Sequence, residues 1–88
     1  MEYCTSLTEL SLGINEIDDI VPLSSLTGLT VLKLFSNRIS DISSLVNNSG
    51  FVDGDVIWIT FNSLDLSEDS ETLNNIKQLE ERGVIIHY

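Results

Sequence analysis

Hydrophobic residues along the chain recur in a pattern with a period of 22 positions. Residues 7–17 read L-x-x-L-x-L-x-x-N-x-I, and residues 29–39 read the same pattern. The match continues through Asp19 and Asp41, Ile20 and Ile42. Self-similarity at a fixed period of this length is the sequence signature of a solenoid, in which each repeat forms one turn of a stack.

Within each copy, apolar and polar residues alternate. Leu10 and Leu12 alternate with Glu9, Ser11 and Gly13. This period of two is typical of a β-strand that buries one of its faces. A third copy resumes at residues 55–62, after a spacing that is three residues longer. The positions that we predict to be buried in the three strands are Leu10, Leu12, Leu32, Leu34, Ile57 and Ile59.

The segments between the strands predict short turns and one longer helix. Asp19 and Asp41 each precede an I-x-x-L run, which predicts a short 3₁₀ or α turn with the aspartate as its cap. The extra residues of the third copy fall within residues 46–54, which are rich in Gly, Asn and Ser and predict a loop. A helix is predicted from about residue 71 to 82, ended by Gly83, and a final strand at 84–88.

This pattern resembles leucine-rich repeat proteins, of the 22-residue type found in internalin-like bacterial proteins and in phosphatase-regulator-like proteins. The resemblance implies an α/β solenoid, a right-handed superhelix with a parallel β-sheet on the concave side and 3₁₀ or α turns on the convex side. Residues 54–88 look like the C-terminal cap of the bacterial members, made of a helix and a strand. We therefore predict one domain with a partial repeat at 1–6, repeats at 7–28, 29–50 and 51–66, and a cap at 67–88.

The resemblance also implies a role for three asparagines at one repeat position. Asn15, Asn37 and Asn62 hold the same offset from the buried strand residues. In the family's geometry they stack as a ladder, each amide bonding backbone groups of neighbouring turns. Such partners matter because a buried amide left without them costs about 1–3 kcal/mol.

Side chains that alternate with the buried residues point to the concave face. Alignment by phase gives three columns across the sheet, beginning at Glu9, Ser11 and Gly13. We expect Ile85 and His87 to extend the second and third columns. The residues that we predict to contact a partner are Val31, Lys33, Phe35, Val56, Trp58, Thr60, Ile85 and His87.

Charge separates this face from the rest of the chain. The formal net charge is -10, with 14 acidic residues against 4 basic ones. This balance argues against binding to nucleic acid or to anionic membrane surfaces, since both need basic patches. Of the acidic residues, only Glu9 falls in the concave columns.

The termini and apolar runs bear on location and assembly. No apolar run approaches the roughly 18 residues of a membrane span, and no charged-then-apolar leader opens the sequence. A cytoplasmic location is favoured unless the chain is part of a secreted or surface protein. The first repeat has no recognisable cap, and we expect that end to be open to self-association.

The residue types needed for catalysis or cofactor binding are sparse. His87 is the single histidine and no serine-histidine-acid set is readable. Cys4, the single cysteine, aligns with the core leucine Leu26 and is expected to be a small buried hydrophobe. The acidic turns lack the ligand spacing of a calcium loop, and no glycine-rich phosphate loop is present. We predict no catalysis, no cofactor and no metal.

Exposed aromatic side chains beside a cation are typical of the centre of an interface. The sequence therefore predicts a non-catalytic module that binds a protein partner on the concave face. A second hypothesis is a structural cap that closes a longer repeat array, and a third is a phosphatase-regulator-like subunit. For Trp58 itself the alternative is that it packs on Phe35 and Val31 and shields the sheet.

Overall fold

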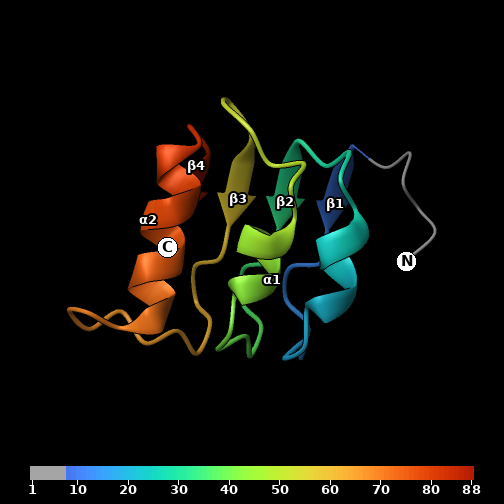
Figure 1. Cartoon of the computed structure of the whole chain (residues 1–88). Coiled ribbons are helices and arrows are strands. Elements are labelled where there is room, and N and C mark those ends of the chain that lie inside the picture. Colours follow the sequence, from blue (N-terminus) through green and yellow to red (C-terminus); the bar gives the residue numbers. More distant parts are fainter. Residues whose placement is uncertain (1–7) are drawn as a thin grey trace.

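A four-stranded parallel sheet forms one side of the molecule (Figure 1). The computed structural model describes residues 8–88, so the predicted partial repeat at 1–6 and Cys4 lie outside the described residues. The strands follow one another in chain order and in register, as each turn of a solenoid stacks on the turn before it. They are β1 (Glu9–Ser11), β2 (Val31–Lys33), β3 (Val56–Trp58) and β4 (Ile85–His87).

Helical segments cover one face of this sheet. They are the 3₁₀ helix η1 (Val21–Ser25), α1 (Ser43–Asn47) and α2 (Glu71–Glu81). Figure 1 shows them side by side in front of the strands, with α1 packed between η1 and α2. The short turns predicted after Asp19 and Asp41 are therefore one 3₁₀ and one α turn, on the side of the sheet that becomes convex.

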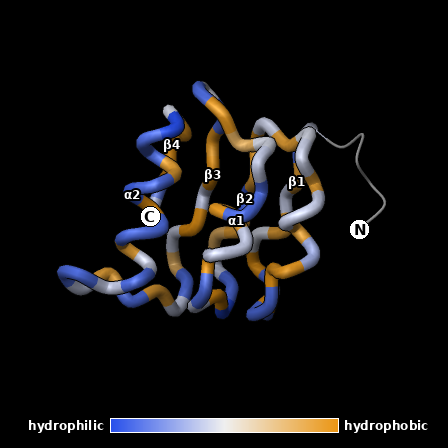
Figure 2. Tube along the Cα trace, viewed as in Figure 1, coloured by the Kyte–Doolittle hydropathy of each residue, from blue (hydrophilic) through white to orange (hydrophobic). Residues whose placement is uncertain are grey.

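The hydrophobic core lies between the sheet and the helical segments. Leu32, Leu34, Ile57 and Ile59 are fully buried there, as their alternation predicts. In the first turn, Leu10 and Leu12 pack against this core but stay partly exposed. Figure 2 shows hydrophobic segments recurring in every turn of the stack, and hydrophilic segments among the turns along its lower edge. Each fully buried Leu or Ile stabilises the fold by about 1.5–3 kcal/mol, so the second and third repeats carry most of the stability.

The predicted loop at 46–54 is only partly a loop, because α1 continues to Asn47. The next residue, Asn48, is buried, and its amide donates hydrogen bonds to the carbonyls of Leu23 and Leu26, both at 3.0 Å. A buried asparagine is not expected at this position, since Asn in a Gly-rich stretch normally indicates a solvated turn. This amide joins the second repeat to the 3₁₀ turn of the first.

The C-terminal cap begins and ends at defined capping residues. Ser70 is the N-cap of α2 and its Oγ accepts a hydrogen bond from the backbone N–H of Leu73 at 3.1 Å. At the other end Gly83 has a φ of 89°, and its N–H donates to Glu80 while the N–H of Val84 donates to Leu79. This pair of hydrogen bonds is the Schellman motif, which a glycine permits.

The register of β4 differs from our expectation by one column. Ile85 pairs with Val56 in the first column, and His87 pairs with Trp58 in the second. The Schellman turn is the reason, because it delivers Val84 beside Asp55, whose carbonyl accepts the N–H of Ile85 at 2.8 Å. Buried Ile86 then lies against buried Ile57, and the prediction that Ile85 and His87 extend the second and third columns is wrong.

Candidate functional site

On the concave face of the sheet, opposite the helices, the first column is apolar except at Glu9. It consists of Glu9, Val31, Val56 and Ile85, paired in register across the four strands. The two valines are half-buried, whereas the side chain of Ile85 is 50% exposed. This column therefore presents a strip of β-branched side chains to whatever approaches the concave face.

The second column combines polar, cationic and aromatic groups. Ser11, Lys33, Trp58 and His87 pair in register. The rings of Trp58 and His87 are stacked, with centroids 3.7 Å apart and planes 14° from parallel. The ring beside Trp58 is thus the imidazole that β4 supplies, whereas the packing alternative placed Phe35 and Val31 there.

Phe35, in the third column, lies against the preceding turn of the stack. Its ring packs on the backbone of Gly13, where a Cβ atom would come within 2.5 Å of the ring. Gly13 therefore makes room for an aromatic ring on the concave face. Thr60, half-buried, occupies the same column in the third repeat.

A fourth row of residues, missed by the sequence analysis, follows the third column. Ile14, Ser36 and Phe61 all have a left-handed backbone, with φ of 58°, 57° and 58°. Ile14 is 77% exposed and Phe61 is 83% exposed. Large side chains are rarely found in this conformation, which costs about 1–2 kcal/mol per residue. For Ile14 and Phe61 the available signal was an apolar residue immediately before the repeated asparagine.

Asn37 and Asn62 make hydrogen bonds between neighbouring turns. The Asn37 amide donates to Leu12, Leu34 and Phe35 at 2.9, 3.1 and 3.2 Å, and its oxygen accepts the N–H of Ile17 at 3.0 Å. Asn62 repeats this arrangement one turn later. Asn15 is exposed, and among residues 8–88 its amide donates only within its own turn, to Leu12 and Gly13. The ladder therefore fixes the turns from which the concave side chains project.

Acidic side chains are found mainly in the turns that follow the strands. Asp41 accepts the N–H of Ser43 at 2.9 Å, and this bond together with one from the Ser43 hydroxyl lowers the pKa of Asp41. Asp65 accepts from the hydroxyl and the N–H of Ser67, which lowers its pKa in the same way. Both carboxylates therefore stay ionised at neutral pH.

In residues 8–88 no three acidic, histidine or cysteine side chains are grouped so as to hold a metal ion. None of the helices described is long and apolar enough to cross a membrane. An apolar hollow of about 150 Å³ lies at the first-repeat end, between Leu12, Ile17 and Leu23. It marks the end where we predicted self-association, which stays a prediction.

Comparison with known proteins identifies the repeats. Residues 5–47 match the family model described as leucine rich repeats, in two copies. No curated protein sequence matches the chain at a significant level. Among solved structures, internalin C2 of Listeria monocytogenes is similar over 97% of this chain, with 29% identity and a TM-score of 0.71. The internalin inlF of the same species is similar over 98%, with 31% identity and a TM-score of 0.77. This chain spans 33% of the first and 24% of the second.

Proposed function

Because this chain is an internalin-like leucine-rich repeat protein, we propose that it is a non-catalytic module that binds a protein partner on the concave face of its sheet. Repeats of this family support an interaction role in general. The observation that carries the proposal for this face is the stacked pair of Trp58 and His87. It lies between Lys33 and half-exposed Ile85, on the side of the sheet that no described helix covers.

A stacked indole suits the centre of an interface. Trp and Tyr dominate binding energy at interfaces because they bury a large area with few rotatable bonds. Contact with His87 restrains the indole of Trp58 before binding, so less side-chain entropy is lost when a partner arrives. The cap strand β4 thereby contributes directly to the proposed surface.

The residues proposed to contact the partner surround this pair. Val31, Val56 and Ile85 supply an apolar strip along the first column, and Phe35 and Thr60 supply the third. Phe61 and Ile14 extend the surface along the adjoining row, where they remain exposed in a strained backbone conformation. Strain and exposure of large apolar side chains together favour a functional reason for keeping them.

The charge of the concave face indicates which kind of protein surface would bind there. Lys33 is the one basic residue in the concave columns of a chain with a net charge of -10. A partner that offers an apolar surface with one carboxylate near its centre complements this arrangement. Nothing in the comparisons favours a capping role or a phosphatase-regulator role over this one.

Binding by paired variants tests the proposal. Proteins that bind the wild-type chain are assayed against a Lys33→Glu, Trp58→Ala variant and against a Lys77→Glu, Val21→Ala control, which alters charge and apolar surface away from the concave face. Loss of an aromatic hot spot costs about 2 kcal/mol or more, so binding should weaken at least about 30-fold in the first variant only. Trp58 is the single tryptophan, and its fluorescence reports contact at this face directly.

Two results would contradict the proposal. One is equal affinity of the concave variant and the control for every partner found. The other is a large fall in the melting temperature of Trp58→Ala with no separate loss of binding, because that outcome favours packing as the role of the indole. Thermal melts of each variant are therefore recorded on the same samples.

A further inference from the structure

Two basic side chains lie on either side of Trp58 in the second concave column. Lys33 pairs with Trp58 from the neighbouring strand β2, and His87 pairs with it from β4. Neighbouring strands are about 4.8 Å apart, so the two basic side chains start from backbone positions about 10 Å apart. The indole therefore lies between an ammonium group and an imidazole, a group that gains a positive charge in mild acid.

The stack on Trp58 leaves the ring nitrogens of His87 available. The imidazole lies within 14° of parallel to the indole, with ring centroids 3.7 Å apart, so its nitrogens are at the edge of the contact. No hydrogen bond joins the imidazole to residues 8–88, and no buried side-chain nitrogen or oxygen among these residues lacks a partner. The ring nitrogens are therefore open to solvent and to a partner that approaches the concave face.

Protonation of the imidazole is compatible with this stack. A cation over the face of an indole is attracted by the negative charge density of the ring face. Protonated His87 can therefore remain on Trp58, with an N–H donor at each ring nitrogen. A carboxylate is the complementary group, because it accepts such hydrogen bonds and carries the opposite charge.

The strands near His87 carry little charge that could neutralise an imidazolium. β3 has no titratable side chain, and Asp55, which precedes it, is buried and hydrogen-bonded. Asp53 lies beside Gly83, before β4 begins. Glu9, the acidic residue of the concave columns, is on β1, three strands or about 14 Å from β4. That separation exceeds the distance of about 10 Å over which 0.1 M salt screens a charge.

The helix α2 also packs against β4, but it covers the other face of the sheet (Figure 1). Buried Ile86 points to that face, so its neighbour His87 projects from the concave face. A proton gained by His87 therefore adds a charge to the concave face that no side chain of the described columns nearby compensates. The charged groups of the helix and its C-cap, all behind the sheet, are Glu71, Lys77, Glu80, Glu81 and Arg82.

We propose that the partner of the concave face is a protein surface with two carboxylates about 10 Å apart, one for Lys33 and one for His87, and that it binds more tightly in mild acid. This inference rests on the proposed function, since it concerns the same face. The charge of an imidazole changes between about pH 5 and 8. On the basic side of this range Lys33 alone attracts the partner, and on the acidic side His87 adds a second charge-assisted contact beside Trp58.

A short acidic peptide tests this inference on the full chain. In acetyl-Glu-Leu-Leu-Glu-amide the two carboxylates are three residues apart, or about 10 Å of extended chain, and both are ionised at pH 5.5. Fluorescence of Trp58, the single tryptophan, follows binding. We expect about threefold higher affinity at pH 5.5 than at pH 8, the effect of one exposed charged contact. The neutral peptide acetyl-Gln-Leu-Leu-Gln-amide should bind equally at the two pH values.

Two variants assign the pH effect to one residue. His87→Gln keeps a polar side chain that does not titrate, so its affinity for the acidic peptide should not change with pH. Lys77→Gln is the matched control, because it removes a positive charge from an exposed position of α2, and it should retain the threefold change. The main-chain carboxylate of Tyr88 is the same in all of these proteins.

A second measurement needs no variant. A ligand that binds the protonated protein threefold more tightly must, by reciprocity, raise the midpoint of the His87 titration by about 0.5 pH unit. His87 is the single histidine, so its imidazole resonances can be assigned directly in nuclear magnetic resonance spectra. An unchanged midpoint in the presence of saturating acidic peptide would overturn the inference.

The outcomes distinguish this inference from the proposed function. If the acidic peptide binds the Lys33→Glu, Trp58→Ala variant as tightly as wild type, the concave face is not the binding site and both proposals fail. If binding requires the concave face but is equally tight at pH 5.5 and pH 8, only the inference about His87 fails. The same conclusion applies if the pH dependence persists in His87→Gln, or if wild type does not bind the acidic peptide.

Discussion

Asn15 and Asn37 hold the same position in consecutive repeats but have different surroundings. Asn37 is buried between two turns and its side chain takes part in four hydrogen bonds, whereas Asn15 is exposed and bonds only its own turn among the residues described. A repeat motif therefore predicts the position of a side chain more reliably than its energetic contribution. The contribution depends on the turn that precedes it.

Replacing each of these two asparagines compares the effect of the same substitution at a buried and at an exposed position of the repeat. Asn37→Ala leaves buried backbone groups of both turns without partners, so we expect it to lower the free energy of unfolding by about 2–3 kcal/mol. Asn15→Ala should cost about 0.5 kcal/mol or less, because water can replace its exposed bonds. Urea unfolding followed by circular dichroism measures both, and equal losses in the two variants would contradict this explanation.

Residue patterns could predict some of the candidate surface but not all of it. The alternation around Leu32 and Ile57 indicates which neighbours face the concave side, because it follows from strand geometry alone. Phe61 and Ile14 could not be found in that way, since a left-handed residue interrupts the alternation. The stack of Trp58 on His87 depends on the register of β4, which the run Val84–Ile85–Ile86 leaves ambiguous because it is apolar at every position.

At the scale of elements, one arginine of the cap helix makes hydrogen bonds to the repeats, beside the core packing of Ile76 and Leu79. Arg82, the C-cap of α2, donates hydrogen bonds to the backbone carbonyls of Val46 and Asn48 at 2.6 and 3.0 Å. These carbonyls lie at the C-terminal end of α1, where helix carbonyls lack intrahelical partners. The guanidinium therefore joins the ends of two helices from different parts of the chain.

Two Arg→Ala variants test the importance of this attachment. Arg82→Ala removes both charge-assisted bonds from a half-buried position and should destabilise the protein by about 1.5–3 kcal/mol. Arg38→Ala removes the same side chain from an exposed ion pair with Glu16, 3.5 Å apart, and should cost about 0.5 kcal/mol or less. Denaturant midpoints provide the comparison, and a larger loss in Arg38→Ala would refute it.

The aspartate turns before the helical segments predict a dependence on acid. Hydrogen bonds from the backbone N–H and the hydroxyl of Ser43 lower the pKa of Asp41 below its usual 3.8. A carboxyl with a lower pKa in the folded state stabilises the fold above the unfolded pKa, and this stabilisation is lost as pH falls through the folded pKa. The melting temperatures of wild type and Asp41→Ala should therefore converge below about pH 3.8.

Thermal melts at pH 6 and pH 3 measure this convergence. Asp18→Ala serves as the control, because Asp18 is exposed and makes no hydrogen bond with the described residues. The control should differ little from wild type at either pH. A gap between wild type and Asp41→Ala that is as large at pH 3 as at pH 6 would show that the turn does not depend on the ionised carboxylate.

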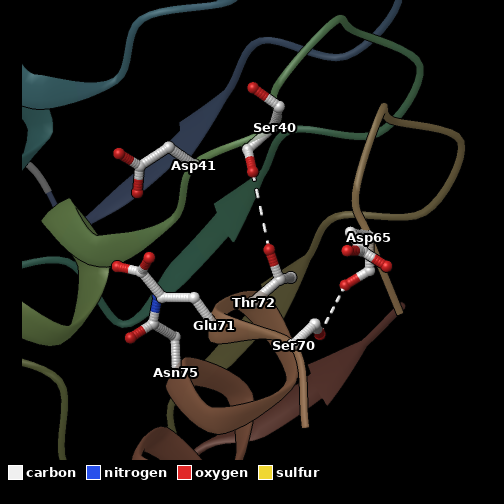
Figure 3. Close-up of a pocket in the computed structure, with 7 residues that line it drawn as sticks. All are labelled: Ser40, Asp41, Asp65, Ser70, Glu71, Thr72 and Asn75. Atoms are coloured by element: carbon white, nitrogen blue, oxygen red, sulfur yellow. Dashed lines mark hydrogen bonds between the residues drawn. The ribbon is translucent and has the colours of Figure 1, made fainter. Parts of the chain in front are cut away.

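The ends of helices could be predicted where they depend on neighbouring residues. Features formed by segments that are distant in the sequence could not be predicted. Gly83 ends α2 as predicted, because a C-terminal glycine turn needs only neighbouring residues. A polar pocket of about 260 Å³ lies between the beginning of α1 and the beginning of α2 (Figure 3). It could not be predicted, since the residues that line it, such as Asp41 and Glu71, are 30 positions apart in the sequence. Asn48 was missed for the same reason, because its partners belong to the repeat before it.

At the scale of the whole molecule, repulsion between like charges opposes folding. The net charge is -10, and Arg38 with Glu16 is the one ion pair among residues 8–88. Added salt therefore screens much repulsion and little attraction. The distance over which salt screens a charge falls from about 30 Å at 0.01 M salt to about 10 Å at 0.1 M. The second distance is shorter than each dimension of the molecule, which measures 36 × 29 × 17 Å.

We expect the melting temperature to rise by several degrees between about 0.01 M and 0.3 M sodium chloride, because screening relieves repulsion in the folded state more than in the expanded one. Differential scanning calorimetry measures the shift. Sodium chloride is preferred to sulfate, which stabilises proteins by exclusion from their surface. A melting temperature that falls with salt would mean that attractive pairs dominate.

The in-register stack of β1 to β4 has a mechanical consequence. The hydrogen bonds between strands run along the axis of the stack, and β1 and β4 lie at its opposite ends (Figure 1). A force that pulls these ends apart loads the interfaces in series, so the weakest turn opens first and the others remain closed. Each turn of 22 residues then releases on the order of 70 Å of extended chain. Under tension the molecule would therefore lengthen in steps, one turn of the stack at a time.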